Sequence, residues 1–270
     1  MSSLTTVWDY RTWILNLTRR ELTSRYKRSV LGWMWSLINP AATLAIYAVV
    51  FGTFLKIQPP VAGNGHTQIF AIYLFIGLVV WNFFNAVVNG SMLALQASGG
   101  MLTKVYFPPE SPAIANMLSA AFQLLIESTI LIVVLALVRN VSWVFVLLPL
   151  VFVMLAVMSI GMGLYVSVYN IVYRDVAYLV TIFMQILFYL TPIVYPLSLV
   201  PEKIGPVPIK WIIENLNPVA AFVDSTRALL YGLYVPPLKE WLVMAAWSLG
   251  IFAVGWWTFN RRAALLIEEL

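Results

Sequence analysis

The stretch Val141–Asn170, VSWVFVLLPLVFVMLAVMSIGMGLYVSVYN, decides the fold class of this chain. It contains no Asp, Glu, Lys or Arg, and it exceeds the about 20 apolar residues that a helix needs to cross a bilayer. Five further stretches have the same character: Ser36–Ile57, Ile69–Leu95, Ala113–Val138, Val176–Tyr195 and Lys239–Asn260. The sequence therefore predicts an all-α integral membrane protein with six transmembrane helices.

The composition of the whole chain agrees with this prediction. Of its 270 residues, 61% are apolar and 10% are charged, against about 45–50% and about 25% in soluble domains. The predicted spans take more than half of the chain, which leaves too little for a soluble catalytic domain. Because the chain has no Cys and one His, His66, we expect no thiol chemistry and no metal site in it.

The basic residues predict the orientation in the membrane. With six spans both termini lie on one side, and the segments on that side carry ten of the 16 Lys and Arg residues. Lys and Arg are enriched in cytoplasmic flanks, so we expect both termini in the cytoplasm. The net charge of +5 then indicates a surface that faces anionic lipid, and no nucleic-acid partner is expected.

Residues 1–34 are predicted to form a cytoplasmic segment with an amphipathic helix. Its apolar positions recur every three or four residues, at Val7, Tyr10, Trp13, Ile14 and Leu17, and Thr18 lies off this stripe. A basic helix with Trp on its apolar side suits the headgroup plane. The alternative is a simple topology anchor.

The predicted six-helix transmembrane domain, residues 35–270, contains two segments that do not span the membrane. Residues 96–112 are cytoplasmic and rich in proline, which predicts a rigid knob. Residues 197–238 lie on the external side, where Asn217-Pro218 predicts a helix start. This segment is too polar for a good span, so we expect short re-entrant or interfacial helices that cap a translocation path.

Several polar residues lie within or beside the predicted spans. Asn82, Asn85 and Asn89 share one helix face, which indicates either a helix contact or a channel lining. The lone carboxylate Glu127 lies mid-span, and we expect it to pair with a polar group of a neighbouring helix. Gly161-Met162-Gly163 predicts a close helix contact. Ion pairs are expected for Asp224 with Arg227 and, at a cytoplasmic turn, for the Arg174-Asp175 pair.

No G-x-x-x-x-G-K-[ST] motif occurs in the sequence, so the chain has no phosphate-binding loop of its own. Two further hypotheses stay open on the residues alone. A proton-coupled secondary transporter would use Glu127 as its titrating carboxylate. An integral membrane enzyme acting on polyprenyl-linked glycans would need clustered polar residues on one loop, whereas the carboxylates here are scattered.

The stretch Arg25–Pro40, RYKRSVLGWMWSLINP, resembles the entry segment of permease subunits from ATP-binding-cassette exporters of the polysaccharide and polyol phosphate type. Four further stretches resemble motifs of that family in the same order: Leu102–Pro108 (LTKVYFP), Tyr173–Val176 (YRDV), Leu190–Tyr195 (LTPIVY) and Leu216–Pro218 followed by Arg227. Each motif alone is weak, but five in order cover essentially the whole chain.

The resemblance implies a half-transporter in the bacterial cytoplasmic membrane. Two copies form the channel, and two copies of a separate cytoplasmic ATPase bind the ATP and Mg, so this chain holds no cofactor. The implied substrate is a glycan or polyol phosphate polymer on undecaprenyl pyrophosphate, such as O-antigen, teichoic acid or capsule.

The resemblance also implies roles for individual residues. The knob is similar to a coupling helix seated in the ATPase, with contacts from Gly100, Lys104, Phe107, Pro108 and Glu110. The N-terminal helix is similar to a gate helix, and Arg25 and Arg28 would face the substrate pyrophosphate.

Aromatic faces and amides suit a polysaccharide in a channel, and Trp and Tyr also gather at membrane interfaces. The predicted channel-lining residues are Trp33, Trp35, Tyr47, Trp81, Asn82, Asn85, Tyr189 and Tyr195, with Phe83, Phe84 and Phe188 as further candidates.

Overall fold

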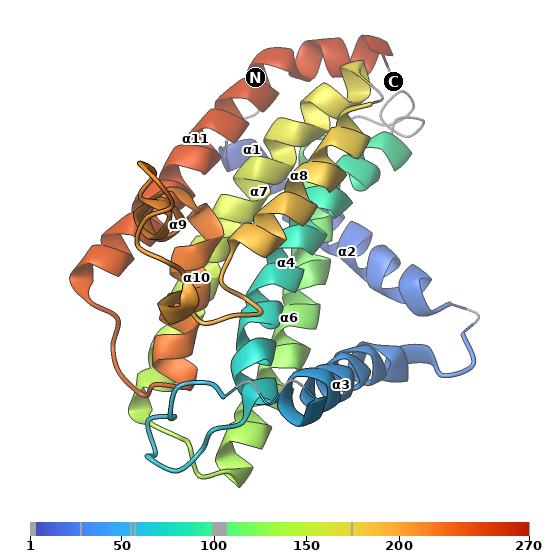
Figure 1. Cartoon of the computed structure of the whole chain (residues 1–270). Helices are drawn as coiled ribbons and strands as arrows, with labels where there is room; N and C mark the ends of the chain where they lie inside the picture. The colour runs from blue at the N-terminus through green and yellow to red at the C-terminus, as the bar shows by residue number, and fades with distance from the viewer. Residues whose placement is uncertain are drawn as a thin grey trace.

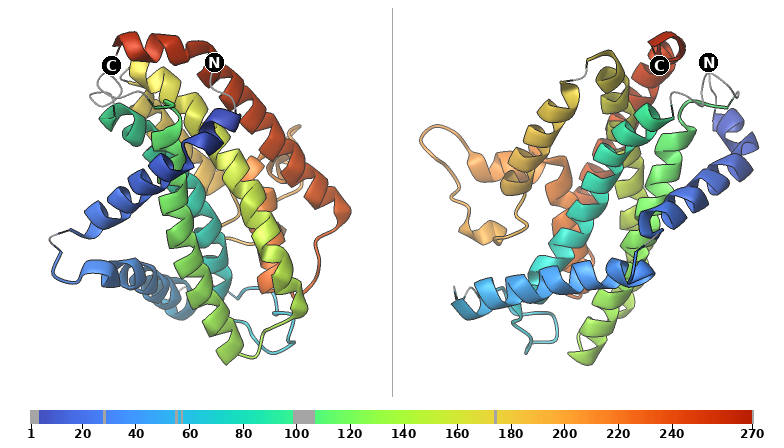
Figure 2. Two further views of the ribbon diagram at one scale, coloured as in Figure 1. Left: turned by 180° about the vertical axis from the view of Figure 1, so that it is seen from behind. Right: turned by 90° about the vertical axis from the view of Figure 1, so that its right-hand side faces the viewer.

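A computed structural model describes residues 4–27, 29–54, 56, 58–98, 107–173 and 175–269. The ordered elements in this part of the chain are helices, as predicted, apart from one isolated bridge between Ile204 and Val207. The helix α1 (Leu4–Asp9) and the C-terminal half of α11 (Leu238–Glu269) lie at the same end of the bundle (Figures 1 and 2).

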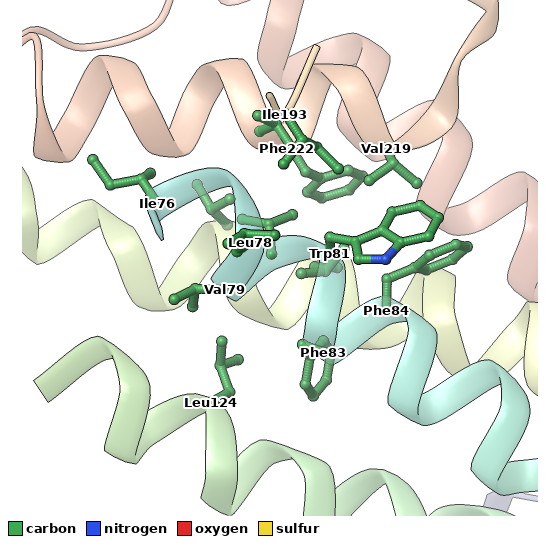
Figure 3. Close-up of a cluster of buried hydrophobic side chains, with 14 of the residues drawn as sticks. Ile76, Leu78, Val79, Trp81, Phe83, Phe84, Leu124, Ile193, Val219 and Phe222 are labelled. Carbon is green, nitrogen blue, oxygen red and sulfur yellow. The ribbon is translucent and has the colours of Figure 1, made fainter. Parts of the chain in front are cut away.

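The centre of the bundle is α4 (Phe70–Ala97), whose side chains are buried along most of its length. It packs against α6 (Ser111–Leu137), α7 (Leu148–Val172) and α10 (Pro218–Leu230). Figure 3 shows Phe83 on the side of Leu124 in α6 and Trp81 on the side of Phe222 in α10. Because Phe83 and Phe84 are buried in this core, the prediction that they line a channel is wrong.

Small residues bring α7 and α11 into close contact. A Cβ atom on Gly255 of α11 would collide with the carbonyl oxygen of Gly161 in α7. Gly163 lies two residues after Gly161 on α7, and a Cβ atom on it would lie 2.6 Å from Ser91 Oγ of α4. The predicted close helix contact is confirmed, and it has two sides: Gly161 faces α11 and Gly163 faces α4.

Five helices in the described ranges are long and apolar enough to cross a membrane: Gly32–Phe54, Phe70–Ala97, Ser111–Leu137, Trp143–Val172 and Leu238–Arg262. The fifth predicted span, Val176–Tyr195, is shorter than expected, because its helix α8 (Val176–Leu190) has 15 residues. It ends where Thr191 is extended, since the residue before a proline avoids the helical region and Pro192 cannot continue the helix. The count of six spans is therefore not confirmed.

The first predicted span is helical but lies across the bundle. It consists of a 3-10 turn (Gly32–Met34), α3 (Trp35–Tyr47) and a π-helical stretch (Ala48–Phe54). Figure 2 shows this helix passing across α4 and α6 instead of beside them. Hydropathy predicts where such a helix begins and ends, but it does not predict the direction of its axis.

The N-terminal segment forms α1 and α2 (Arg11–Tyr26), with a break at Tyr10. Helix α2 packs against α6 through Ile14 and Thr18, both of which are buried. Thr18 Oγ1 donates to the carbonyls of Ile14 (2.9 Å) and of Ala115 in α6 (3.5 Å). Thr18 lies off the apolar stripe but is nevertheless buried, because α6 covers that side of α2.

The external segment contains two short helices, α9 (Ile209–Leu216) and α10, as its sequence predicts. Asn217 begins α10 as an N-cap: its side chain accepts hydrogen bonds from Val219 N (3.0 Å) and Ala220 N (3.3 Å). Nearly all of α10 is buried against the bundle. Its re-entrant position relative to a membrane stays a prediction.

Candidate functional site: a polar groove along α4

Two pockets adjoin on one side of α4 and share Thr43 and Asn82. The first, about 420 Å³, lies between α3, α4 and α6. The second, about 490 Å³, lies between α3, α4 and α8. We call their union the α4 groove. The first pocket is lined by Ser29, Trp35, Ser36, Asn39, Pro40, Thr43, Asn82, Gln123 and Glu127. The second is lined by Thr43, Tyr47, Leu78, Trp81, Asn82, Asn85, Asn89, Thr181, Met184, Gln185, Phe188 and Tyr189.

The α4 groove collects most of the residues predicted to line a channel. Six of the eight line it: Trp35, Tyr47, Trp81, Asn82, Asn85 and Tyr189. Trp33 instead packs edge-on against Phe122, with ring centroids 5.5 Å apart. Tyr195 donates its hydroxyl to the carbonyl of Tyr189 (2.9 Å). These two residues do not line either pocket.

An amide row and a group of aromatic rings both line the second pocket. Asn82, Asn85 and Asn89 lie on the same face of α4, and Asn89 Nδ2 donates to Asn85 Oδ1 (2.8 Å). The Phe188 ring of α8 lies 5.3 Å from the Trp81 ring of α4 and 5.4 Å from that of Tyr189, centroid to centroid. The asparagine stripe therefore lines a cavity, and its role in a channel stays a prediction.

Glu127 lies at the wall of the first pocket and is 5% exposed. Its Oε1 accepts a hydrogen bond from Gln123 Nε2 (3.0 Å), and the same nitrogen donates to the carbonyl of Ser36 in α3 (3.1 Å). This donor lies on the same helix as Glu127, four residues earlier, and it bridges Glu127 to α3. Asn82 of the neighbouring helix α4 also hydrogen-bonds to Glu127, so the expected pairing with a polar group of a neighbouring helix is confirmed.

Arg227 of α10 joins three separate elements inside the bundle. Its guanidinium donates to the carbonyls of Pro192, of Ile193 (2.6 Å) and of Tyr73 in α4 (3.3 Å). It also lies over the Tyr73 ring, 3.8 Å from the centroid. A planar fork of donors suits several carbonyls at once. Sequence reasoning missed these carbonyls because backbone acceptors carry no residue signature.

The predicted pair of Asp224 with Arg227 is confirmed, with Oδ1 and Nη1 4.0 Å apart. This is the longest of the contacts that Arg227 makes. Burial, opposed by the charge of Arg227 and aided by Glu240 and Glu214, raises the pKa of Asp224 to about 6.

Two of the sequence motifs meet in space. Asn217, the N-cap of α10, donates through Nδ2 to Thr191 Oγ1 (2.9 Å), and Thr191 Oγ1 donates to the carbonyl of Leu187 (2.7 Å). The turn that ends α8 is therefore held by the first residue of α10 and by Arg227. We call this set of Thr191, Pro192, Ile193, Asn217 and Arg227 the α8–α10 junction.

A known protein family matches most of the chain. Residues 13–231 match the model of the family described as ABC-2 type transporter. The chain belongs to this family. The predicted membership in the permease subunits of ATP-binding-cassette exporters is confirmed.

Named relatives of this ABC-2 chain are polysaccharide permeases. It is 26% identical to the O-antigen export system permease protein RfbA of Myxococcus xanthus, over 98% of this chain and 97% of the relative. It is 28% identical to the protein of the same name from Klebsiella pneumoniae, over 79% and 78%. It is 22% identical to the polysialic acid transport protein KpsM of Escherichia coli, over 93% of both.

The residues predicted to couple this ABC-2 chain to an ATPase are only partly described. Gly100 and Lys104 lie outside the described residues. Phe107 and Pro108 are buried, and the Phe107 ring lies 5.5 Å from that of Trp13 in α2. Glu110 is fully buried at the start of α6, which does not fit the polar contact with the ATPase that the resemblance implies for it. Packing of α6 against its neighbours encloses this first turn.

The remaining predicted positions are only partly described by the structure. Arg28, Arg174 and the side chain of Arg25 lie outside the described residues, so their predicted roles stay predictions. Asp175 is exposed and precedes α8, where its carbonyl accepts from Tyr178 N (3.1 Å) and Leu179 N (3.2 Å). These backbone hydrogen bonds supply the local contacts predicted for that turn.

Proposed function

We propose that this chain is the channel-forming subunit of an exporter that moves a polysaccharide, such as an O-antigen, across the bacterial cytoplasmic membrane. The observation that carries the proposal is the α4 groove, a continuous row of amides, hydroxyls and aromatic rings in an otherwise apolar helix bundle. Polar groups at membrane depth mark a substrate path when they line a cavity. The named relatives are export permeases, which supports this reading.

The groove chemistry suits a sugar polymer in transit. Amide groups of Asn82, Asn85 and Asn89 both donate and accept, so they serve hydroxyls in many orientations. The rings of Trp81, Phe188 and Tyr189 offer flat apolar faces that a sugar ring can slide along. Such contacts are tolerant of sequence and individually weak, which allows entry and release.

We further propose a half-transporter that works as a homodimer with two copies of a separate ATPase. The absence of a phosphate-binding loop from the sequence supports a separate energy source. One side of the groove is formed by α8, whose outer face exposes Tyr178, Ile182 and Ile186. A second copy of the chain would cover this face and close the groove into a channel.

The substrate is proposed to carry undecaprenyl pyrophosphate, with Arg25 and Arg28 facing the phosphates. A polyol phosphate polymer such as teichoic acid is the alternative cargo implied by the family. Residues 96–112 are proposed to seat in the ATPase. Since Phe107 contacts Trp13 and Ser111 begins α6, a push on this segment would reach α2 and α6 directly.

The test is transport by the reconstituted chain with and without its ATPase. We expect ATP-dependent movement of lipid-linked O-antigen into the vesicle lumen only when both proteins are present. Asn85→Leu, which removes an amide from the groove, should lower the rate at least tenfold. Asn215→Leu, the same change on α9, should leave the rate unchanged.

Two results would contradict this proposal. Transport by the chain alone, driven by a proton gradient, would favour the secondary transporter with Glu127 as its carboxylate. Equal rates for the two asparagine variants would remove the α4 groove from the substrate path.

A further inference from the structure

The α4 groove is nearly free of charge. Across the described helices α3, α4, α6 and α8, Glu127 is the only Asp, Glu, Lys or Arg residue. The described residues that line the two pockets include no Lys or Arg. Lys56, which follows the helix of α3, lines a different pocket with Gln58 and Gln68.

We propose that the α4 groove selects an uncharged glycan, with Glu127 and Gln123 forming a hydrogen-bonding site for the hydroxyls of a neutral sugar. Polymers that carry a carboxylate or a phosphate in every repeat are excluded. This inference rests on the proposed function and specifies its substrate class.

The first pocket has the chemistry of such a site. Glu127 supplies an acceptor that makes stronger hydrogen bonds to hydroxyls than a neutral oxygen does. Gln123 holds Oε1 in place from one side, and Asn82 approaches the carboxylate from α4. Trp35 at the same pocket offers a flat apolar face. A volume of about 420 Å³ admits a sugar ring with its hydroxyls.

The same features oppose an anionic unit. A carboxylate or phosphate that leaves water needs a paired positive charge, and the described residues that line the groove offer none. Glu127 adds like-charge repulsion, which is weakly screened where water is scarce. A second copy of the chain brings the same four helices, so dimer formation adds no positive charge from them.

The test compares a neutral hexasaccharide with an anionic one. The complex of this chain with its ATPase, in detergent micelles, is titrated with mannohexaose and with hexagalacturonate, and binding is followed by saturation-transfer difference NMR. We expect mannohexaose to bind at least ten times more tightly than hexagalacturonate at neutral pH.

Variants that change the charge at position 127 test whether Glu127 causes the selectivity. In Glu127→Gln, which keeps the size and most of the hydrogen bonds, the ratio should fall to threefold or less. In Glu127→Lys the preference should reverse. Glu240→Gln is the matched control, because Glu240 lies outside the groove and accepts from Ser225 Oγ at 3.1 Å; its ratio should match that of the native chain.

Three results would overturn the inference: equal binding of the two hexamers to the native complex, no binding of mannohexaose, or an unchanged ratio in Glu127→Gln. The first two need no variant, so a folding defect leaves the inference testable. ATP-driven transport is measured separately. A complex that transports yet binds hexagalacturonate equally well contradicts the selectivity alone, whereas a complex without ATP-driven transport contradicts the proposed function.

Discussion

Arg227 shows how one residue holds several elements of the bundle together. Three backbone carbonyls and one aromatic ring surround its guanidinium, and they belong to α4 and to the turn after α8. Leaving a buried carbonyl without a donor costs about 1–3 kcal/mol. The contribution of Arg227 is thus mainly to stability and position, and the Asp224 contact at 4.0 Å adds little.

Arg227→Lys tests this role, because it keeps the charge and loses the planar fork. We expect the variant to lose about 1–3 kcal/mol of unfolding free energy for each carbonyl that it no longer satisfies. Thermal unfolding of the detergent-solubilised chain, followed by tryptophan fluorescence, measures the change. Arg261→Lys is the control, since Arg261 is exposed and lies over Trp257 at 4.2 Å. Equal unfolding temperatures for the two variants would contradict the assignment.

Individual residues also show which contacts the sequence does not predict. The pair of Asp224 and Arg227 was predictable, because two charges three residues apart on a helix are neighbours. The carbonyl partners of Arg227 lie 34, 35 and 154 residues away, and no spacing rule reaches them. Asn140 was missed for the same reason: it donates to the carbonyls of Leu230 (2.8 Å) and Tyr231 (3.1 Å).

At the scale of elements, the N-cap of α10 can be tested separately from the other contacts of the α8–α10 junction. Asn217→Ala should lose the N-cap, about 0.5–2 kcal/mol, together with the hydrogen bond to Thr191. Combining it with Thr191→Val in a double-mutant cycle isolates the second contribution. Asn215→Ala, two residues earlier on α9, controls for loss of an amide. Strict additivity of the two junction variants would show that they do not interact.

The crossing of α7 and α11 gives a prediction with an internal control on the same helix. Gly255→Ala places a methyl group against the Gly161 backbone, which cannot move aside as a side chain can, so α11 must shift and the unfolding temperature should fall. Gly250→Ala meets nothing within 4 Å and should be neutral or stabilising by about 0.5–1 kcal/mol. Thermal unfolding of both variants measures the difference. A more stable Gly255→Ala chain would contradict the close contact.

The elements differ in how far the sequence predicts them. Helices α4, α6, α7 and α11 were predicted well, since long apolar runs leave few alternatives in a bilayer. Helix α8 was predicted too long because the apolar run continues through Pro192, although proline ends the helix. The crossing direction of α3, the packed face of α2 and the burial of Glu110 depend on tertiary contacts. Within the α4 groove, the asparagine period identified one wall, and the bridge through Gln123 was not visible.

At the scale of the molecule, the bundle has two distinct ends. One end carries α1, the start of α8 and the C-terminal half of α11 (Figures 1 and 2). The other carries the loop around His66 and the turn around Asn140, which are tied together because Asn64 N donates to Asn140 Oδ1 (3.1 Å). The α4 groove lies between these ends. The excess of Lys and Arg near the termini then predicts which end faces the cytoplasm.

The absence of native cysteine makes this orientation directly testable, because any thiol label reports the introduced position alone. His66 and Asp175 are both exposed and lie at opposite ends, so His66→Cys and Asp175→Cys form a matched pair. In intact cells, a membrane-impermeant maleimide should label His66→Cys, and Asp175→Cys should react only after permeabilisation. Lys203→Cys, exposed before α9, should behave like His66→Cys if the external segment faces outward. The unmodified chain must remain unlabelled throughout. Labelling of Asp175→Cys in intact cells would mean that the end with the termini faces outward. An ATPase bound at that end would then have no ATP on its side of the membrane.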